Sequence, residues 1–349
     1  MTQKISFIIS SLLLLMVITF AIVFNANKPH LMVLHSYNTD YSWTRNVNAG
    51  LIRVLEKHPD YAITWHYMDS KKHTDSSWLR RARVIAKQAI DTWNPEVLIV
   101  VDNFAQTVAQ EYVNKPDISI IFAGVNGSIE PYGYHKAVNV TGILENRQCN
   151  ALRELILSIK NTGHTKKFDA DSKGIRIRYM IDSSKSVLGD KSYIDNFNWA
   201  PIVYAGSFVA KNFREWQEEI LKSASKTDYI FVTNYRQLPI SEADPLLTPP
   251  EEVMIWTEKH SPVPVIGLNP FNVEDGGMLS VGVSPYEQGE TIAKMTEQII
   301  ENGVSASAIP VVPNYQFVVS MRKSAMEKRG IIIPAVYEAF SRATNSYFE

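Results

Sequence analysis

The sequence is poor in cysteine and close to neutral, and both properties exclude classes of protein. Cys149 is the only cysteine in 349 residues, which rules out an intrachain disulfide and a zinc site built from several cysteines. The 35 basic and 36 acidic residues give a net charge of −1, and no basic patch indicates a nucleic-acid partner. With 20% charged and 45% hydrophobic residues, the chain has the composition of an ordinary globular protein.

The common catalytic motifs are also missing. The sequence has no GxGxxG after a strand, no Walker A lysine loop and no HExxH, and Gly206-Ser207 lacks the second glycine of a GxSxG elbow. Acidic residues are scattered, so no pair of catalytic carboxylates can be nominated. We therefore predict a protein that is not an enzyme and needs no cofactor or metal.

Only one apolar run is long, and it lies at the N-terminus. Residues 5–24 follow Lys4 and carry no charge, a pattern typical of an export signal, although the run is also long enough to span a bilayer. Ala26 suits a cleavage site, whereas Phe24 is bulky for the −3 position. Residues 1–29 are thus either a signal peptide or an N-terminal membrane anchor. Both place the rest of the chain in the periplasm, soluble after cleavage or tethered to the inner membrane by residues 5–24.

After this segment, strand and helix patterns alternate. Strand-like runs at residues 31–34, 61–68, 96–101 and 118–122 enclose helical patterns, which predicts a doubly wound parallel sheet. A polar stretch at 161–174 precedes a second series of strands, so a second α/β lobe follows the first.

Polar residues follow the predicted strands in both lobes, where open parallel sheets bind ligands. The candidate ligand-binding residues are Ser36, Tyr37, Asp102, Asn103 and Asn126 in the first lobe and Asp182, Ser183, Asn234 and Asn269 in the second. Helix-start N–H groups with Ser36 and Ser183 suit an anionic group, and Asp102 or Asp182 suits an ammonium group.

Aromatic side chains near these strand ends could enclose an apolar body: Tyr37, Trp43, Phe104, Tyr235 and Phe271. Each feature also has a structural explanation. Asp102 and Asp182 can cap helices, Asn269-Pro270 can form a turn, and Trp43 and His35 can simply pack in the core.

Most of the chain, from about residue 31 to 334, resembles the substrate-binding proteins of ABC transporters that include tryptophan/tyrosine-type binding proteins, and the most specific part of the resemblance is C-terminal. The resemblance rests on GGMLSVGVSPYEQGETIAKMTEQIIENG (276–303), IPVV (309–312) and YQFVVSMRKSAMEKRGIIIP (315–334), together with SIIFAGVN (119–126) and NVTGILEN (139–146). The opening LHSYNTDYSWTRNVNAGL (34–51) is similar to a branch whose domain also occurs as the extracytoplasmic sensor of histidine kinases and diguanylate cyclases.

The resemblance implies the type I periplasmic binding fold, with two lobes joined by a hinge of about three crossovers. Carried over, the first lobe is 30–146 plus 279–308, the second is 147–278 plus 309–340, and 341–349 is a C-terminal tail. It also implies capture of a small ligand by hinge closure and its delivery to an ABC permease. The candidate residues themselves suit an amino acid or an aromatic compound as the ligand. The alternatives are a ligand-sensing protein that signals through a membrane histidine kinase or diguanylate cyclase, and an exported enzyme on the same scaffold.

Overall fold

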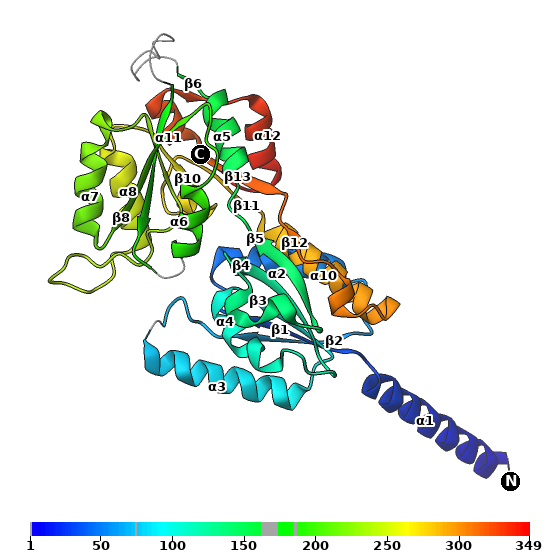
Figure 1. The fold of residues 1–349 in the computed structure, drawn as a ribbon. Helices are drawn as coiled ribbons and strands as arrows, with labels where there is room; N and C mark the ends of the chain where they lie inside the picture. Colours follow the sequence, from blue (N-terminus) through cyan, green and yellow to red (C-terminus); the bar gives the residue numbers. More distant parts are fainter. Residues whose placement is uncertain (1, 74, 162–173, 185–186) are drawn as a thin grey trace. The chain divides into compact units, whose positions relative to one another are not determined.

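The computed structural model describes residues 2–73, 75–161, 174–184 and 187–349. The chain divides into two compact units (Figure 1). Unit 1 is Met1–Val125, Ile129–Ile143 and Gln288–Val312, and unit 2 is Asn126–Ser128, Leu144–Glu287 and Pro313–Glu349. Apart from residues 126–128, the chain passes between the units at 143/144, 287/288 and 312/313.

The N-terminal segment forms the helix α1 (Thr2–Ala26). The side chains of residues 2–9, 21 and 26 lie outside the described part of the chain. Within the part that is described, no helix combines the length and the apolar character needed to cross a membrane.

Unit 1 is built on a six-stranded sheet of order β12-β5-β4-β3-β1-β2. Its strands are β1 (His30–His35), β2 (Ala62–Tyr67), β3 (Val97–Val101), β4 (Ser119–Asn126), β5 (Val140–Glu145) and β12 (Val312–Pro313). Strand β1 pairs in parallel with β2 and β3, and β3 pairs in parallel with β4. All five residues of β3 are buried, as expected for an apolar β-branched run in the middle of a parallel sheet.

The helices of unit 1 are α2 (Ser42–Leu55), α3 (Ser76–Trp93), α4 (Asn103–Ala109) and most of α10 (Pro285–Asn302), with short 3₁₀ turns at Gln110–Tyr112, Glu130–Tyr132, Tyr134–Lys136 and Ala306–Ala308. Helix α3 begins where the side chain of Asp75 accepts a hydrogen bond from the backbone N–H of Trp78 at 2.8 Å. This bond satisfies one of the free N–H groups of the first turn.

Unit 2 is built on a seven-stranded sheet of order β15-β13-β11-β10-β9-β7-β8. Its strands are β7 (Arg176–Asp182), β8 (Val203–Ala210), β9 (Tyr229–Val232), β10 (Val265–Gly267), β11 (Leu279–Val283), β13 (Phe317–Arg322) and β15 (Tyr347–Phe348). All pairs are parallel except β11 with β13. Together with unit 1, this confirms the predicted α/β fold of two mainly parallel sheets.

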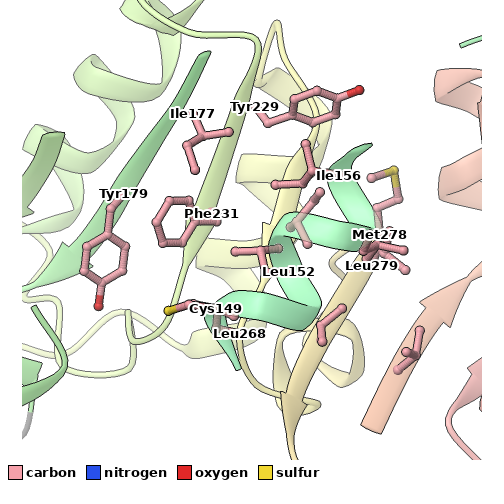
Figure 2. Close-up of a cluster of buried hydrophobic side chains, with 14 of the residues drawn as sticks. Cys149, Leu152, Ile156, Ile177, Tyr179, Tyr229, Phe231, Leu268, Met278 and Leu279 are labelled. Atoms are coloured by element: carbon pink, nitrogen blue, oxygen red, sulfur yellow. The ribbon is translucent and has the colours of Figure 1, made fainter. Parts of the chain in front are cut away.

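The helices of unit 2 are α5 (Cys149–Ser158), α6 (Val187–Asp195), α7 (Phe213–Lys222), α8 (Pro250–His260), α9 (Phe271–Glu274), α11 (Lys323–Arg329) and α12 (Ala335–Ala343), with a 3₁₀ turn at Ser223–Ser225. Two short strands, β6 (Lys160–Asn161) and β14 (Ile331–Ile332), form a separate antiparallel pair. The core of this unit includes Cys149, Leu152, Tyr179 and Phe231 (Figure 2). Cys149 is buried, and this burial raises the pKa of its thiol to about 12, so the side chain packs as a small apolar residue.

The division of the chain differs from the predicted lobes in four places. Residues 126–128 and 144–146, predicted for the first lobe, lie in unit 2. Residues 279–287, predicted for the first lobe, lie in unit 2, because β11 pairs with β10 and β13 there. Residues 309–312, predicted for the second lobe, lie in unit 1, where β12 borders β5.

Candidate functional site

The carboxyl ends of three strands of unit 1 meet at one edge of its sheet. His35 of β1 lies opposite Val101 of β3, and Val101 lies opposite Ala123 of β4. The next residues along β1 and β3 are Ser36 and Asp102, so the parallel register brings these two predicted site residues to the same edge.

Ser36 is fully buried and links β1 to the start of α4. Its hydroxyl donates to the carbonyl of Val101 at 3.0 Å and accepts from the backbone N–H of Ala105 at 2.8 Å. The capping bond that the sequence suggested for Asp102 is therefore made by Ser36, from another strand. These two hydrogen bonds fix the position of the start of α4 relative to β1 and β3. They use the Ser36 hydroxyl, which the sequence predicted to contact a ligand.

Asp102 is 4% exposed and precedes α4 with φ of 68°. Its side chain makes no capping bond to α4. Instead, Oδ1 accepts a hydrogen bond from Nε1 of Trp43 at 3.0 Å. A Cβ atom at Gly124, where φ is +65°, would lie 2.7 Å from the same oxygen, so only glycine allows β4 to approach this carboxylate.

Beside this carboxylate edge, unit 1 carries an aromatic pair with a cation. Tyr37 and Tyr41 pack edge to face with ring centroids 5.3 Å apart, and Nζ of Lys71 lies 5.0 Å and 5.5 Å from the two centroids. Asn103, the first residue of α4, is half-buried. The two rings have faces that attract positive charge, a property that sequence reasoning missed because Lys71 belongs to a loop far along the chain.

In unit 2, the residues after β7 and β9 form one hydrogen-bonded group. Oδ1 of Asp182 accepts from the N–H and the hydroxyl of Ser184 at 3.0 and 2.5 Å, and Oδ2 accepts from the N–H of Gln237 at 3.1 Å. The side-chain amide of Asn234 donates to the Ser184 hydroxyl at 3.0 Å. Ser183, which lies between Asp182 and Ser184 in the chain, is exposed. Asp182 and Asn234 are thus linked through Ser184, and Asp182 holds three hydrogen bonds within the unit.

A second group in unit 2 surrounds the buried Arg147, which sequence reasoning missed. Its guanidinium lies 3.0 Å from Glu145 and 2.7 Å from Asp190 and donates to the amide oxygen of Asn269 at 2.8 Å. With its amide nitrogen turned toward Glu145, Asn126 donates to both carboxylate oxygens at 2.9 and 3.1 Å. Two predicted site residues, Asn126 and Asn269, therefore meet through this cluster.

Burial and the neighbouring carboxylates have opposite effects on the pKa of Arg147. Burial alone would lower the pKa of Arg147, but the carboxylates of Asp190 and Glu145 outweigh it and hold the pKa above its ordinary value. Two charged residues directly after a buried strand, in ILENR (143–147), are the signal that could have indicated the Glu145–Arg147 pair. No such signal marks Asp190 in α6.

A third group of unit 2 consists of Tyr235, Arg236 and Asp275, which are linked by hydrogen bonds. This side chain is fully buried and donates its hydroxyl to Asp275 at 2.5 Å. Arg236 donates to both oxygens of Asp275 at 2.7 Å and stacks 4.4 Å from the ring centroid of Phe271. Burial raises the pKa of Asp275, and Arg236 opposes this effect. Tyr235 packs in the core, while Phe271 remains half-buried beside Arg236.

Comparisons with known proteins show what the chain is similar to. The sequence model described as "ABC transporter substrate binding protein" matches residues 210–342, which confirms the predicted resemblance in the C-terminal part of the chain. None of the curated proteins matches the sequence.

Solved structures of binding proteins share the fold over nearly the whole chain. An ABC domain from Streptococcus pneumonia in complex with L-Trp is 18% identical, with a TM-score of 0.61, and the match covers 90% of this chain and 98% of that one. The ligand-free, open structure of a substrate-binding protein with adhesive properties from Clostridium difficile is 16% identical, with a TM-score of 0.64 and coverage of 88% and 96%. A solute binding protein from Bacillus halodurans with bound myo-inositol is 14% identical, with a TM-score of 0.50 and coverage of 90% and 98%. At these identities the likeness establishes the type I periplasmic binding fold.

Proposed function

We propose that this chain is an extracytoplasmic solute-binding protein that captures a small molecule by closure of its two lobes and delivers it to an ABC permease. The proposal rests above all on one observation: in each unit, buried polar side chains stand at the carboxyl ends of parallel strands, at Ser36 and Asp102 in unit 1 and at Asp182 and Asn269 in unit 2. The matches to binding proteins support it.

The chemistry of the unit 1 edge favours a ligand with a positively charged group. Asp102 is a buried carboxylate that accepts a hydrogen bond from the neutral indole of Trp43, and a carboxylate forms its strongest hydrogen bonds with charged donors. Tyr37 and Tyr41 already hold one cation, Lys71, near their rings. An ammonium group at Asp102 and an apolar body against the tyrosines would suit an amino acid or an aromatic amine.

Thermal unfolding of the full chain tests this proposal, with the fluorescence of its seven tryptophans as the readout. L-tryptophan, other amino acids, aromatic amines, myo-inositol and other sugars would each be added separately. A ligand present at 100 times its dissociation constant adds about 2.7 kcal/mol to the free energy of unfolding. Failure of every compound to raise the melting temperature would contradict the binding function.

Two variants then locate the site. Asp102→Asn and Asn234→Ala should reduce the ligand-induced rise in melting temperature. Asp117→Asn, which changes an exposed aspartate of the same unit as Asp102, should leave it unchanged. Equal responses of all three variants would place the ligand elsewhere.

Export and transport can be tested separately. Protease treatment of intact spheroplasts should digest the chain, and N-terminal sequencing of the mature protein distinguishes cleavage near Ala26 from retention of residues 5–24. Cells without the gene should lose uptake of the identified ligand. Normal uptake combined with loss of a ligand-induced signalling response would instead support a sensor kinase or cyclase as the partner.

A further inference from the structure

The loop between β9 and α8 presents apolar side chains to solvent. Three of them are exposed: Ile240 by 41%, Leu246 by 68% and Leu247 by 45%. In Figure 1 this is the yellow-green loop that leads into α8 and extends away from the body of unit 2. Clustered exposed apolar side chains are unusual in a soluble domain and mark interaction sites.

The loop is held in shape by its backbone. Ile240 donates its N–H to the carbonyl of Leu246 at 2.9 Å, and Thr248 donates to Leu238 at 2.9 Å. Leu238 and Thr248 at its base are buried, so the loop is anchored in the unit. A pre-formed loop loses little conformational entropy when a partner binds it.

The loop is also acidic. Glu242 and Asp244 are exposed between the apolar residues, and Glu251 and Glu252 follow in the first turn of α8. No lysine or arginine occurs between positions 237 and 258. The two glutamates of α8 also suit a helix N-terminus, and Asp244 accepts a hydrogen bond from the backbone N–H of Leu246 at 3.1 Å within the loop. Glu242 has no helix to stabilise. Apolar side chains surrounded by charge of one sign fit a partner with an apolar depression and a basic rim.

We propose that residues 240–247 are a docking element that inserts into a basic-rimmed apolar depression on the extracytoplasmic face of a multispanning membrane protein. This inference rests on the proposed function, in which such a protein receives the ligand, and it assigns the contact to one loop. The loop begins only a few residues after Asn234 and Gln237, which belong to the hydrogen-bonded group of Asp182. A partner that holds the loop is therefore connected through a short segment to the candidate ligand site.

Photo-crosslinking in intact cells tests the proposal. p-Benzoylphenylalanine is placed at Leu246 in the full chain, and at Leu221 of α7, which is 57% exposed, as the matched control. Irradiation followed by mass spectrometry of the adduct identifies the partner. We expect a light-dependent adduct with a multispanning membrane protein from position 246 only, and a several-fold lower yield when Glu242→Lys and Asp244→Lys are added.

Each other result overturns the proposal: no adduct, equal adducts from both positions, an adduct with a soluble protein, or an adduct with a second copy of this chain. The Glu242→Lys/Asp244→Lys variant should keep the melting temperature and the ligand-induced stabilisation of the wild type. If the wild type is stabilised by a ligand but gives no membrane adduct, the docking inference fails and the binding function stands. If no ligand stabilises the wild type, the binding function itself fails.

Discussion

Nε1 of Trp43 lies 3.0 Å from Oδ1 of Asp102 and donates a hydrogen bond to it. Both side chains are buried. The bond ties α2, which carries Trp43, to the end of β3, where Asp102 stands, and so sets the position of the carboxylate that we propose as a ligand contact.

Trp43→Phe removes this donor while it keeps an aromatic ring. A hydrogen bond to a charged group contributes about 1.5–3 kcal/mol, so the free energy of unfolding should fall by roughly that amount in urea titrations. Trp93→Phe is the control, because Nε1 of Trp93 donates to a neutral carbonyl, that of Leu31, at 3.1 Å. If Trp93→Phe lowered the free energy of unfolding by as much or more, the hydrogen bond to Asp102 would stabilise the protein no more than a bond to a neutral carbonyl does.

Gly124→Ala tests the close approach of β4 to Asp102. The new Cβ would lie 2.7 Å from Oδ1 of Asp102. Gly133→Ala provides a matched control, since Gly133 has a similar φ of +75° and nothing within 4 Å of a new Cβ. Both variants place a Cβ at a positive φ, which costs about 1–2 kcal/mol, and only Gly124→Ala adds a clash. Urea midpoints should therefore fall further for Gly124→Ala, and equal midpoints would rule out the steric constraint.

The fold could be predicted well because each strand and helix is indicated by a hydrophobic pattern within its own short stretch of sequence. In the run at 96–101, the apolar, mostly β-branched residues that follow Glu96 form the fully buried β3. In the same way, the strand-like run at 31–34 lies within β1, whose residues 31–35 are all buried. The lobe boundaries were harder to predict, since the pairing of β11 with β13 depends on residues about forty positions apart.

The site was less predictable for the same reason. Strand ends can be read from the sequence, so the meeting of Ser36 with the end of β3 follows from the parallel register. Side-chain partners cannot be read in this way. Asp190 contacts Arg147 across 43 positions, and Ser36 caps α4 across 69 positions, where the sequence alone pointed to the neighbouring Asp102.

Arg147→Met should strongly destabilise the chain. It removes the cation from between the buried carboxylates of Glu145 and Asp190, and removal of one partner of a buried ion pair costs about 3–5 kcal/mol. Arg53→Met is the control, because Arg53 is 69% exposed in its pair with Glu290 and such pairs contribute about 0–1 kcal/mol. The triple variant Arg147→Met/Glu145→Gln/Asp190→Asn should recover much of the loss in urea unfolding. If Arg147→Met costs no more than Arg53→Met, the cluster is not energetically coupled.

His35 should make the chain sensitive to acid. Its ring is fully buried and stacks on Tyr67 and Trp65, with centroids 5.2 and 6.2 Å away. Burial lowers the pKa of His35 from 6.5 to about 3, and the side chain of Asn48 opposes this only in part. The unfolded chain therefore binds a proton at this position as the pH falls below about 6.5, whereas the folded chain does not until about pH 3.

This contribution is fully present above pH 6.5 and is lost on acidification, with a limiting slope of about 1.4 kcal/mol per pH unit. His35→Phe keeps a stacked ring but cannot take up a proton. Urea unfolding of both proteins between pH 7.5 and about 4.5 measures the difference, in which the acidic groups common to both cancel. The wild type should lose stability relative to His35→Phe only below about pH 6.5, because above that pH the unfolded histidine is neutral as well. Parallel stability curves over the whole range would mean that His35 titrates alike in both states, and its ring would then have to be reached by water in the folded protein.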